Sequence, residues 1–327
     1  MDDSTELSRI FLGTGSTSAL HGQVRWAPAK SLWLTAHVAV AVIGGALTLS
    51  WSAVAVFLLT TATTLCLGHS LGMHRRLIHN SYECPRWLEY FFVHCGVLVG
   101  LAGPFGMVHT HDLRDWAQRQ PACHPYLRHG AGLVKDGWWQ LHCDLVLDHA
   151  PQFRPEPRIA HDKVLRFMER TWMLQQLPLA LLLYALGGWA WVVWGVCMRV
   201  VVSVTGHWLV CYFAHNHGEM DNEVTGAAVQ GHNVRWMSYL TMGESWHNNH
   251  HAFPGSAVLG LYPGQPDPGW WVLNALRNLG LVWNVVLPAD LPPRKQLLPL
   301  TERARGGAGT IGPRACPVLG LIGKGAR

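Results

Sequence analysis

The stretch Ser31–Met73, SLWLTAHVAVAVIGGALTLSWSAVAVFLLTTATTLCLGHSLGM, contains no aspartate, glutamate, lysine or arginine. A bilayer core of about 30 Å needs roughly 20 apolar residues per helix, so this stretch accommodates two helices that turn near residues 50–52. A second run, Thr171–Phe213, carries Arg199 as its one charge and Gly187-Gly188 as its expected turn. The sequence therefore predicts two transmembrane helical hairpins, which give four spans.

The composition of all 327 residues agrees with a membrane protein. Hydrophobic residues make up 49% of the chain, charged residues 14%, and there are 17 tryptophans, whose indole rings favour membrane interfaces. Between the hairpins, Tyr90–Val108 is uncharged but contains His94 and the helix-breaking Gly103-Pro104-Phe105-Gly106. This segment is expected either to cross the membrane or to lie within it or in its plane.

The positions of the cations predict the orientation. Both hairpin turns lack lysine and arginine, whereas the opposite helix ends are flanked by them, and short cytoplasmic segments are enriched in these residues. We therefore expect a multi-pass protein with both termini in the cytoplasm and an all-α architecture under a cytosolic helical cap. The predicted divisions are a cytosolic segment 1–30, a membrane domain with its cap at 31–300, and a disordered tail at 301–327. Within the cap, Trp270–Leu287 is expected to form one further helix.

Histidines gather where the predicted helices reach the cytoplasmic side. His74-Arg-Arg-Leu-Ile-His79 follows the second span, His215 ends the fourth, and His247-Asn-Asn-His250-His251 lies in the cap. Helical spacing places residues three and four apart on one face. A bound metal is the simplest reason to gather neutral imidazoles. An all-nitrogen set argues against magnesium and calcium and allows zinc, copper or iron.

These motifs resemble the histidine boxes of the membrane fatty-acid desaturase superfamily, in particular its acyl-CoA desaturase branch. His74–His79 is similar to the first box, HxxxxH, and Gly243–Pro254 is similar to the third, GEGxHNxHHxFP. The resemblance implies four transmembrane helices beneath a cytosolic cap and two iron ions held by histidines. It also implies O2 as the oxidant and desaturation of a lipid acyl chain.

The second box departs from the family pattern, HxxHH. Here Gln120 and Cys123 occupy the first two ligand places, and His124 is retained. Among the nearby histidines, which include His109 and His129, we favour His111 as a substitute. The predicted metal ligands are His74, His79, His111, His124, His215, His247, His250 and His251. Candidates to orient these imidazoles through their second nitrogen are Glu244, Asp115, Asn248 and Asn249.

The resemblance also implies an external electron source. The chain has no haem-binding HPGG and no ferredoxin-type cysteine pattern, so we expect a separate electron-transfer protein, ferredoxin-like or of cytochrome type. Basic residues offered for its docking are Arg75, Arg76, Arg114 and Arg119. The dispersed cations argue against nucleic acid as a partner. Alternative hypotheses are hydroxylation of a fatty acid, sphingolipid, alkane or carotenoid, and a non-catalytic membrane metal-binding protein.

Overall fold

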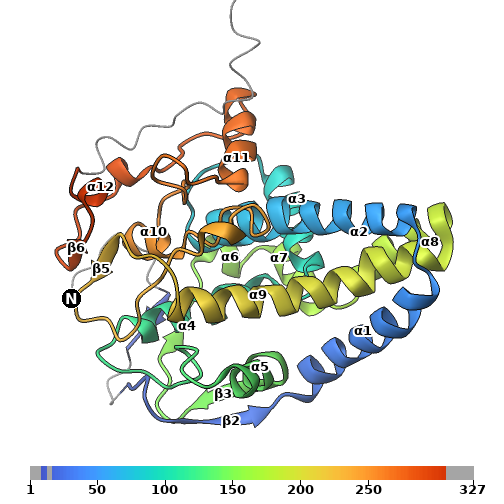
Figure 1. The fold of residues 1–327 in the computed structure, drawn as a ribbon, viewed down its shortest axis with the longest axis horizontal. Helices are drawn as coiled ribbons and strands as arrows, with labels where there is room; N and C mark the ends of the chain where they lie inside the picture. The colour runs from blue at the N-terminus through green and yellow to red at the C-terminus, as the bar shows by residue number, and fades with distance from the viewer. Residues whose placement is uncertain (1–8, 13–16, 307–327) are drawn as a thin grey trace, which may run out of the picture.

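The computed structural model describes residues 9–12 and 17–306. Two helical hairpins project to one side of a body of shorter elements (Figure 1). In the first hairpin, α1 (Pro28–Leu47) is followed by α2 (Trp51–Thr63), which continues directly into the π-helix η1 (Thr64–Ile78). Ser50 caps α2 by accepting a hydrogen bond from the Ala53 amide, because a helix start leaves such amides without intrahelical partners.

The second hairpin comprises α8 (Gln176–Val192), the π-helical η2 (Val193–Met198) and α9 (Arg199–Asn216). Helical geometry breaks inside α8 at Gly187-Gly188, where Gly188 has φ of 62°, a conformation that glycine adopts without a Cβ clash. The chain then folds back, and its two arms pack closely. A β-carbon at Gly195 would lie only 2.6 Å from Leu183 Cδ1. The tips of the two hairpins meet where Trp191 Nε1 donates to Ser52 Oγ at 3.3 Å.

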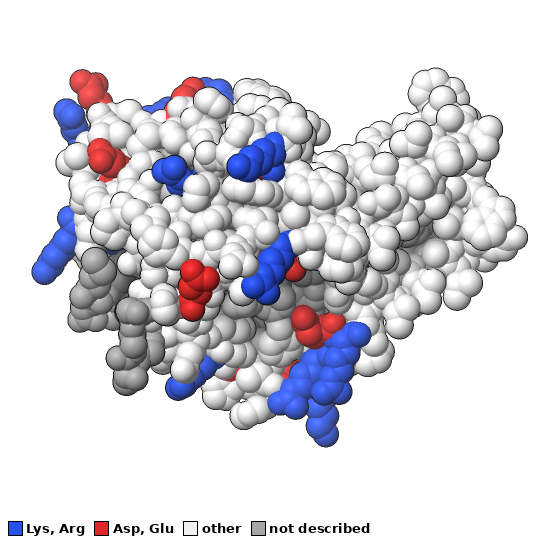
Figure 2. Space-filling view, turned by 90° about the horizontal axis from the view of Figure 1, so that it is seen from below, with Lys and Arg blue, Asp and Glu red and all other residues white. Residues whose placement is uncertain are grey.

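Three helices in the described part of the chain are long and apolar enough to cross a membrane: Pro28–Leu47, Trp51–Ile78 and Gln176–Asn216. Large apolar side chains on these helices are exposed, among them Val42 (67%) and Leu181 (70%). Figure 2 shows charged side chains on the body and none on the projecting hairpins of the visible face. A surface of this kind is stable against lipid rather than water, so the protein associates with a membrane.

Within the described residues, the body consists of short helices and three antiparallel two-stranded sheets. Its helices are α3 (Arg86–Leu98), α4 (Pro104–Gln118), α5 (Leu133–His142), α6 (Pro157–Ala160), α7 (Lys163–Arg170), η3 (Arg235–Met237), α10 (His247–Ala252), α11 (Pro268–Asn278), η4 (Pro288–Asp290) and α12 (Glu302–Arg305). Its strand pairs are β1 (Ile10–Phe11) with β4 (Gln152–Phe153), β2 (Gly22–Trp26) with β3 (Cys143–Leu147), and β5 (Asn222–Val224) with β6 (Leu297–Pro299). The fold is thus mostly helical, and the all-α prediction missed these sheets.

Three predicted segments have different bounds in the structure. The uncharged stretch 90–108 is divided between α3 and α4 by a break at Gly100, which has φ of 90°. With 13 residues α3 is too short to cross a bilayer. The cap helix predicted over 270–287 ends at Asn278. The predicted tail 301–327 begins with the short helix α12, Glu302–Arg305. Residues 307–327 lie outside the described residues.

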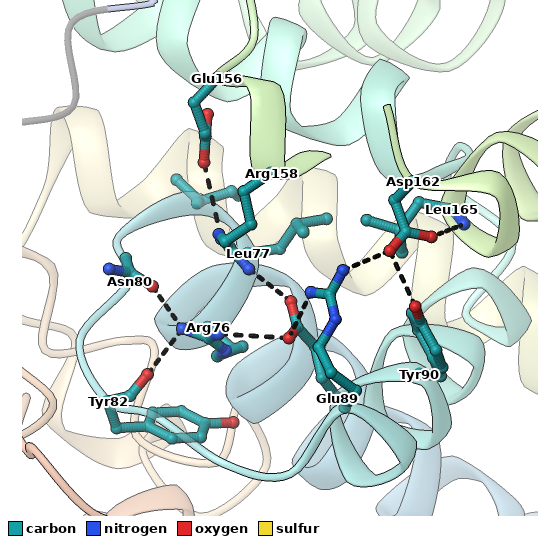
Figure 3. Close-up of polar contacts among 12 residues, drawn as sticks. Arg76, Leu77, Asn80, Tyr82, Glu89, Tyr90, Glu156, Arg158, Asp162 and Leu165 are labelled. Atoms are coloured by element: carbon teal, nitrogen blue, oxygen red, sulfur yellow. Dashed lines mark hydrogen bonds and ion pairs between the residues drawn. The ribbon is translucent and has the colours of Figure 1, made fainter. Parts of the chain in front are cut away.

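Helix α3 packs closely against η1. A β-carbon at Gly68 would lie 2.3 Å from the Cys95 carbonyl carbon, and one at Gly72 would lie 2.5 Å from that of Phe92. The two helices are also joined by ion pairs around buried Glu89, which contacts Arg76 and Arg158 (Figure 3). Glu89 also pairs with the partly exposed Arg86. Burial alone would raise the pKa of Glu89, but the three guanidinium groups lower it by more, so the net pKa is below its usual value. The carboxylate therefore stays ionised and holds Arg76 at the end of η1.

Candidate metal centre

Seven of the predicted ligands converge in two adjoining groups. Within each group the ligand nitrogens lie within 4.8 Å of one another. The first, called here the four-histidine cluster, contains His74, His79, His111 and His250. The second, the three-histidine cluster, contains His215, His247 and His251.

The π-helical geometry of η1 explains how His74 and His79 reach one site. In an α-helix of 3.6 residues per turn, residues five apart point about 140° away from each other. Here the His79 amide donates to the His74 carbonyl at 3.0 Å, an i to i+5 bond that widens the turn. The two imidazole centroids are consequently 4.8 Å apart. The HxxxxH spacing thus works because this helix is not α-helical.

Helix α10 divides its histidines between the two clusters. His247 and His251, four residues apart, have ring centroids 4.5 Å apart in the three-histidine cluster. His250 instead lies 4.6 Å from His74 in the four-histidine cluster. The stacked His247 and His250 rings, with centroids 5.7 Å apart, bring the clusters side by side. A single HxxHH motif therefore serves both groups.

A buried carboxylate fixes the His74 ring. Glu244 Oε2 lies 2.6 Å from His74 Nδ1, which leaves Nε2 for the cluster. The other carboxylate oxygen accepts hydrogen bonds from Ser70 Oγ at 2.5 Å and Arg75 Nη1 at 2.8 Å. Although burial raises the pKa of Glu244, His74 and Arg75 lower it below its usual value. Histidine ligands in metalloproteins commonly have a carboxylate on the second nitrogen in this way.

The three-histidine cluster is oriented by the backbone instead. His215 Nδ1 donates to the Cys211 carbonyl at 2.7 Å, so its Nε2 is directed to the cluster. His247 Nε2 lies 3.0 Å from both His215 Nε2 and His251 Nε2. Two nitrogens bound to one transition metal at about 2.0–2.1 Å are themselves roughly 3 Å apart. The spacing of these atoms therefore fits a shared ion.

The protonation chemistry of the clusters also fits a metal. His79 Nε2 and His250 Nδ1 are buried and have no hydrogen-bond partner among the described residues, which is uncommon for buried polar atoms. Burial, with the neighbouring His74 and His111, lowers the pKa of His247 to about 3. The pKa values of His250 and His251 are also well below the usual range, again chiefly through burial. Neutral imidazoles of this kind offer lone pairs to a transition metal.

The eighth predicted ligand, His124, lies apart from both clusters. Its Nδ1 accepts a hydrogen bond from the Tyr126 amide at 3.1 Å, and its ring lies 6.2 Å from that of Trp139. Gln120 Nε2 donates to the Trp116 carbonyl. Buried Cys123 belongs to a hydrophobic core cluster. Thus the chain's counterpart of the second box supplies His111 to the clusters, from a position upstream of the altered HxxHH sequence.

His129 contacts the three-histidine cluster without joining it. Its ring stacks on that of His215 with centroids 5.4 Å apart. Arg114 Nη1 donates to His129 Nε2 at 2.6 Å, while His129 Nδ1 faces Asp136 Oδ2 at 2.9 Å. Because arginine has no acceptor, His129 Nε2 must accept, and Nδ1 carries the proton. Both nitrogens are therefore occupied.

Two of the residues proposed to orient the imidazoles have other partners. Asn248 bonds the backbone of Asn222 and Gly231, and Asn249 bonds Leu259 and Gln265. These contacts hold α10 in the body instead of orienting imidazoles.

The predicted basic docking face also needs correction. Arg75 and Arg76 are 1% and 5% exposed, because they are paired with buried carboxylates, Arg75 with Glu244 and Asp267 and Arg76 with Glu89. A partner protein cannot reach them.

A cavity of about 630 Å³ opens beside both clusters, a size typical of sites for small organic ligands. Its walls include residues of α1, the 100–102 loop, α4, α5 and α9, among them Trp33 and Leu101, and Trp172 from the turn that follows α7. His69 and His207 also line it, with ring centroids 4.9 Å apart. Sequence reasoning overlooked His69, although its position five residues before His74 repeats the HxxxxH spacing.

Comparisons with known proteins identify the family of the chain. The sequence model of the family described as "Fatty acid desaturase" matches residues 49–259, which is more than half of the chain. The sn-1 stearoyl-lipid 9-desaturase of Anabaena variabilis is 38% identical over 243 residues, covering 73% of this chain and 85% of that protein. The palmitoyl-monogalactosyldiacylglycerol delta-7 desaturase of Arabidopsis thaliana is 34% identical over 262 residues, covering 77% and 67%. The acyl-CoA 5-desaturase AL21 of Anemone leveillei is 32% identical over 254 residues, covering 76% of each.

The chain belongs to the fatty acid desaturase family. It is an oxidoreductase that desaturates fatty acyl chains, and its two histidine clusters form a candidate metal site. The alternative hypotheses of hydroxylation and of non-catalytic metal binding are not favoured, because the named relatives are desaturases.

Proposed function

We propose that this desaturase uses two iron ions and O2 to introduce a carbon–carbon double bond into the acyl chain of a membrane lipid. The observation that carries the proposal is the convergence of seven histidines in two adjoining clusters beside one cavity. The four-histidine cluster holds one ion and the three-histidine cluster the other. His124 is left out of the proposed ligand set because it lies apart from both.

The protein's contribution is to hold the ligands and the substrate in fixed positions. An iron pair, when bound, supplies the O2 chemistry that removes hydrogen from an unactivated methylene, which side chains cannot do. Glu244 keeps the second nitrogen of His74 engaged, and the Cys211 carbonyl does the same for His215. Rigid second-nitrogen contacts of this kind maintain ligand orientation during the reaction.

The cavity is the proposed binding site for the acyl chain. It lies where the hairpins join the body, and its lining combines apolar side chains such as Trp33, Leu101 and Trp172 with His74, His250 and His251 from the clusters. An acyl chain placed along these walls has its methylenes next to the histidines and excludes water from them. A displacement of about 1 Å is enough to alter which C–H bond reacts, so the walls select the position.

The favoured carrier of the acyl chain is a membrane lipid. The lipid desaturases of Anabaena and Arabidopsis reach 38% and 34% identity, and the acyl-CoA desaturase reaches 32%. The cavity also lies at the base of the hairpins, which places it next to the bilayer that holds such a substrate.

The proposed topology has four spans with the cap in the cytoplasm. The reversal at Gly187-Gly188 divides Gln176–Asn216 into two antiparallel arms. The uncharged residues from Thr171 onward lengthen the first arm, and with them the second hairpin crosses twice, as the first does. Lysine and arginine near the body ends of the helices favour the cytoplasmic side for the cap. A separate reduced electron-transfer protein, ferredoxin-like or of cytochrome type, approaches from that side.

Expression of the full chain in a host that supplies an electron donor tests the proposal. Gas chromatography–mass spectrometry of lipid acyl chains is expected to show products two mass units lighter than their precursors, and metal analysis of anaerobically purified protein two irons per chain. Products sixteen mass units heavier would overturn the desaturation assignment. Tightly bound zinc at one per chain would overturn the iron assignment. Products confined to acyl-CoA would overturn the lipid carrier.

A further inference from the structure

Arg9 is a buried cation whose hydrogen-bond partners adjoin two residues of the four-histidine cluster. It precedes β1 directly and lies outside the segment matched by the family, yet it is 3% exposed. Its carbonyl accepts a hydrogen bond from the Arg154 amide at 2.8 Å, which joins this strand to β4. Burial of an arginine requires partners for its charge and its donors.

Two of those partners are the last carbonyls of η1. Arg9 Nη2 donates to Leu77 O at 3.1 Å and to Ile78 O at 3.0 Å. These groups form the negative end of the helix, where a cation is stabilised. The next residue along the chain is His79, so the guanidinium fixes the backbone that carries one member of the cluster.

The other partners are carboxylates. Arg9 Nη1 donates to Asp112 Oδ2 at 3.0 Å, and Asp112 Oδ1 lies 3.5 Å from His111 Nδ1. Arg9 Nε and Nη2 contact the two oxygens of Glu156 at 2.6 and 3.2 Å. Glu156 also pairs with Arg158, which continues to Glu89 (Figure 3). One planar guanidinium thus connects the supports of His79 and His111, which come from different helices.

We propose that Arg9 is a positioning residue for the four-histidine cluster, acting through the end of η1 on His79 and through Asp112 on His111. This inference rests on the proposed binding of one metal ion by that cluster. Arginine suits this position because its planar guanidinium has five N–H donors for the two carboxylates and two carbonyls around it. Lysine, in contrast, has a single ammonium on a flexible side chain. The three-histidine cluster has no contact with Arg9 among the described residues.

The experiment measures the affinity of each cluster separately. Ferrous iron is titrated anaerobically into full-length protein carrying either His251→Ala, which leaves the four-histidine cluster intact, or His250→Ala, which leaves the other intact. Adding Arg9→Gln to the first background is expected to weaken iron binding roughly 10- to 100-fold, the usual effect of removing an outer partner of a metal ligand. In the second background the affinity is expected to stay unchanged.

Two further variants separate positioning from folding. Arg25→Gln removes an exposed arginine of β2, whose contact is Gln23, and is expected to leave iron affinity unchanged. Arg9→Lys keeps the positive charge and is expected to restore part of the affinity. Asp112→Asn combined with Arg9→Gln should cost less than the sum of the single changes, because the two residues act on His111 in series.

The outcomes distinguish the inference from the proposed function. Unchanged affinity of the four-histidine cluster in Arg9→Gln overturns the inference. Equal losses at both clusters, together with a lower unfolding temperature of the metal-free protein, would also overturn it and indicate a general structural role. Failure of either single-histidine background to bind iron at all would instead count against the proposed two-iron centre, whatever Arg9 does.

Discussion

The two histidine clusters are built in different ways. The four-histidine cluster takes ligands from η1, α4 and α10 and is surrounded by buried ion pairs that involve Glu244, Arg75, Asp112 and Arg9. The three-histidine cluster takes ligands from α9 and α10, and within residues 9–12 and 17–306 no ion pair joins it to a carboxylate. Its known orienting contact is the Cys211 carbonyl, one helical turn before His215.

The two similar ligand sets therefore depend on different interactions for their orientation. Helical hydrogen bonding is local, so the orientation of His215 follows once α9 forms. The four-histidine cluster depends on charges that are far apart in sequence and are buried together, and loss of one member leaves its partner uncompensated. The four-histidine cluster is therefore expected to be the more sensitive of the two to changes outside the ligands themselves.

Removing a ligand gives the largest expected effect. His250→Ala and His251→Ala each take a histidine from a different cluster, so each variant should retain one metal of two and lose desaturation by more than the roughly 100-fold seen for outer partners. Metal content per chain and product yield check this. Loss of both metals in each variant would show that the two clusters do not bind metal independently.

Removing the carboxylate beside His74 comes next. Glu244→Gln is expected to weaken metal binding at the four-histidine cluster by about 10- to 100-fold and to spare the three-histidine cluster. Glu219→Gln is the matched control, because Glu219 is half exposed in its contact with Arg235. Similar losses in both clusters would show that Glu244 acts on the whole body.

Acid is expected to have a smaller and graded effect. An unfolded imidazole titrates near 6.5, whereas burial lowers the pKa of His247 to about 3 in the folded protein. Between these values the unfolded state binds more protons, so the free energy of unfolding of the metal-free protein falls as the pH drops from 7 to 5. The unfolding temperature should fall by roughly several degrees over this pH range. In His247→Gln the unfolding temperature should depend less on pH. A pH-independent unfolding temperature contradicts this expectation.

The smallest effect is expected at the altered second box. His124→Ala should retain activity within about twofold, because the residue lies outside both histidine clusters. Loss of its hydrogen bond with the Tyr126 amide is expected to cost about 1 kcal/mol of stability. His111→Ala, in contrast, should behave as the ligand variants do. Product yields of the pair, measured at equal membrane abundance, decide between them. A large loss in His124→Ala would return that residue to the ligand set.

The sequence was sufficient for the features that depend on local patterns. Apolar stretches of the required length, with Arg199 as their one charge, predicted both hairpins, including turns close to Ser50 and at Gly187-Gly188. The first and third boxes contain five of the seven clustered histidines and identified the family. His215 was predicted from its position at the end of the fourth span, and His111 was favoured from among several nearby histidines. Apolar length and motif spacing act within one segment, so they can be read without knowledge of the fold.

The tertiary structure decided which parts of the chain meet. It placed His111 with the four-histidine cluster and His124 elsewhere, divided the histidines of α10 between the clusters, and buried Arg75 that the sequence offered as a docking cation. It also brought Arg9 to Asp112, more than a hundred positions away. Contacts of this kind depend on packing and on the pairing of buried charges across distant segments, and no pattern within a segment encodes them.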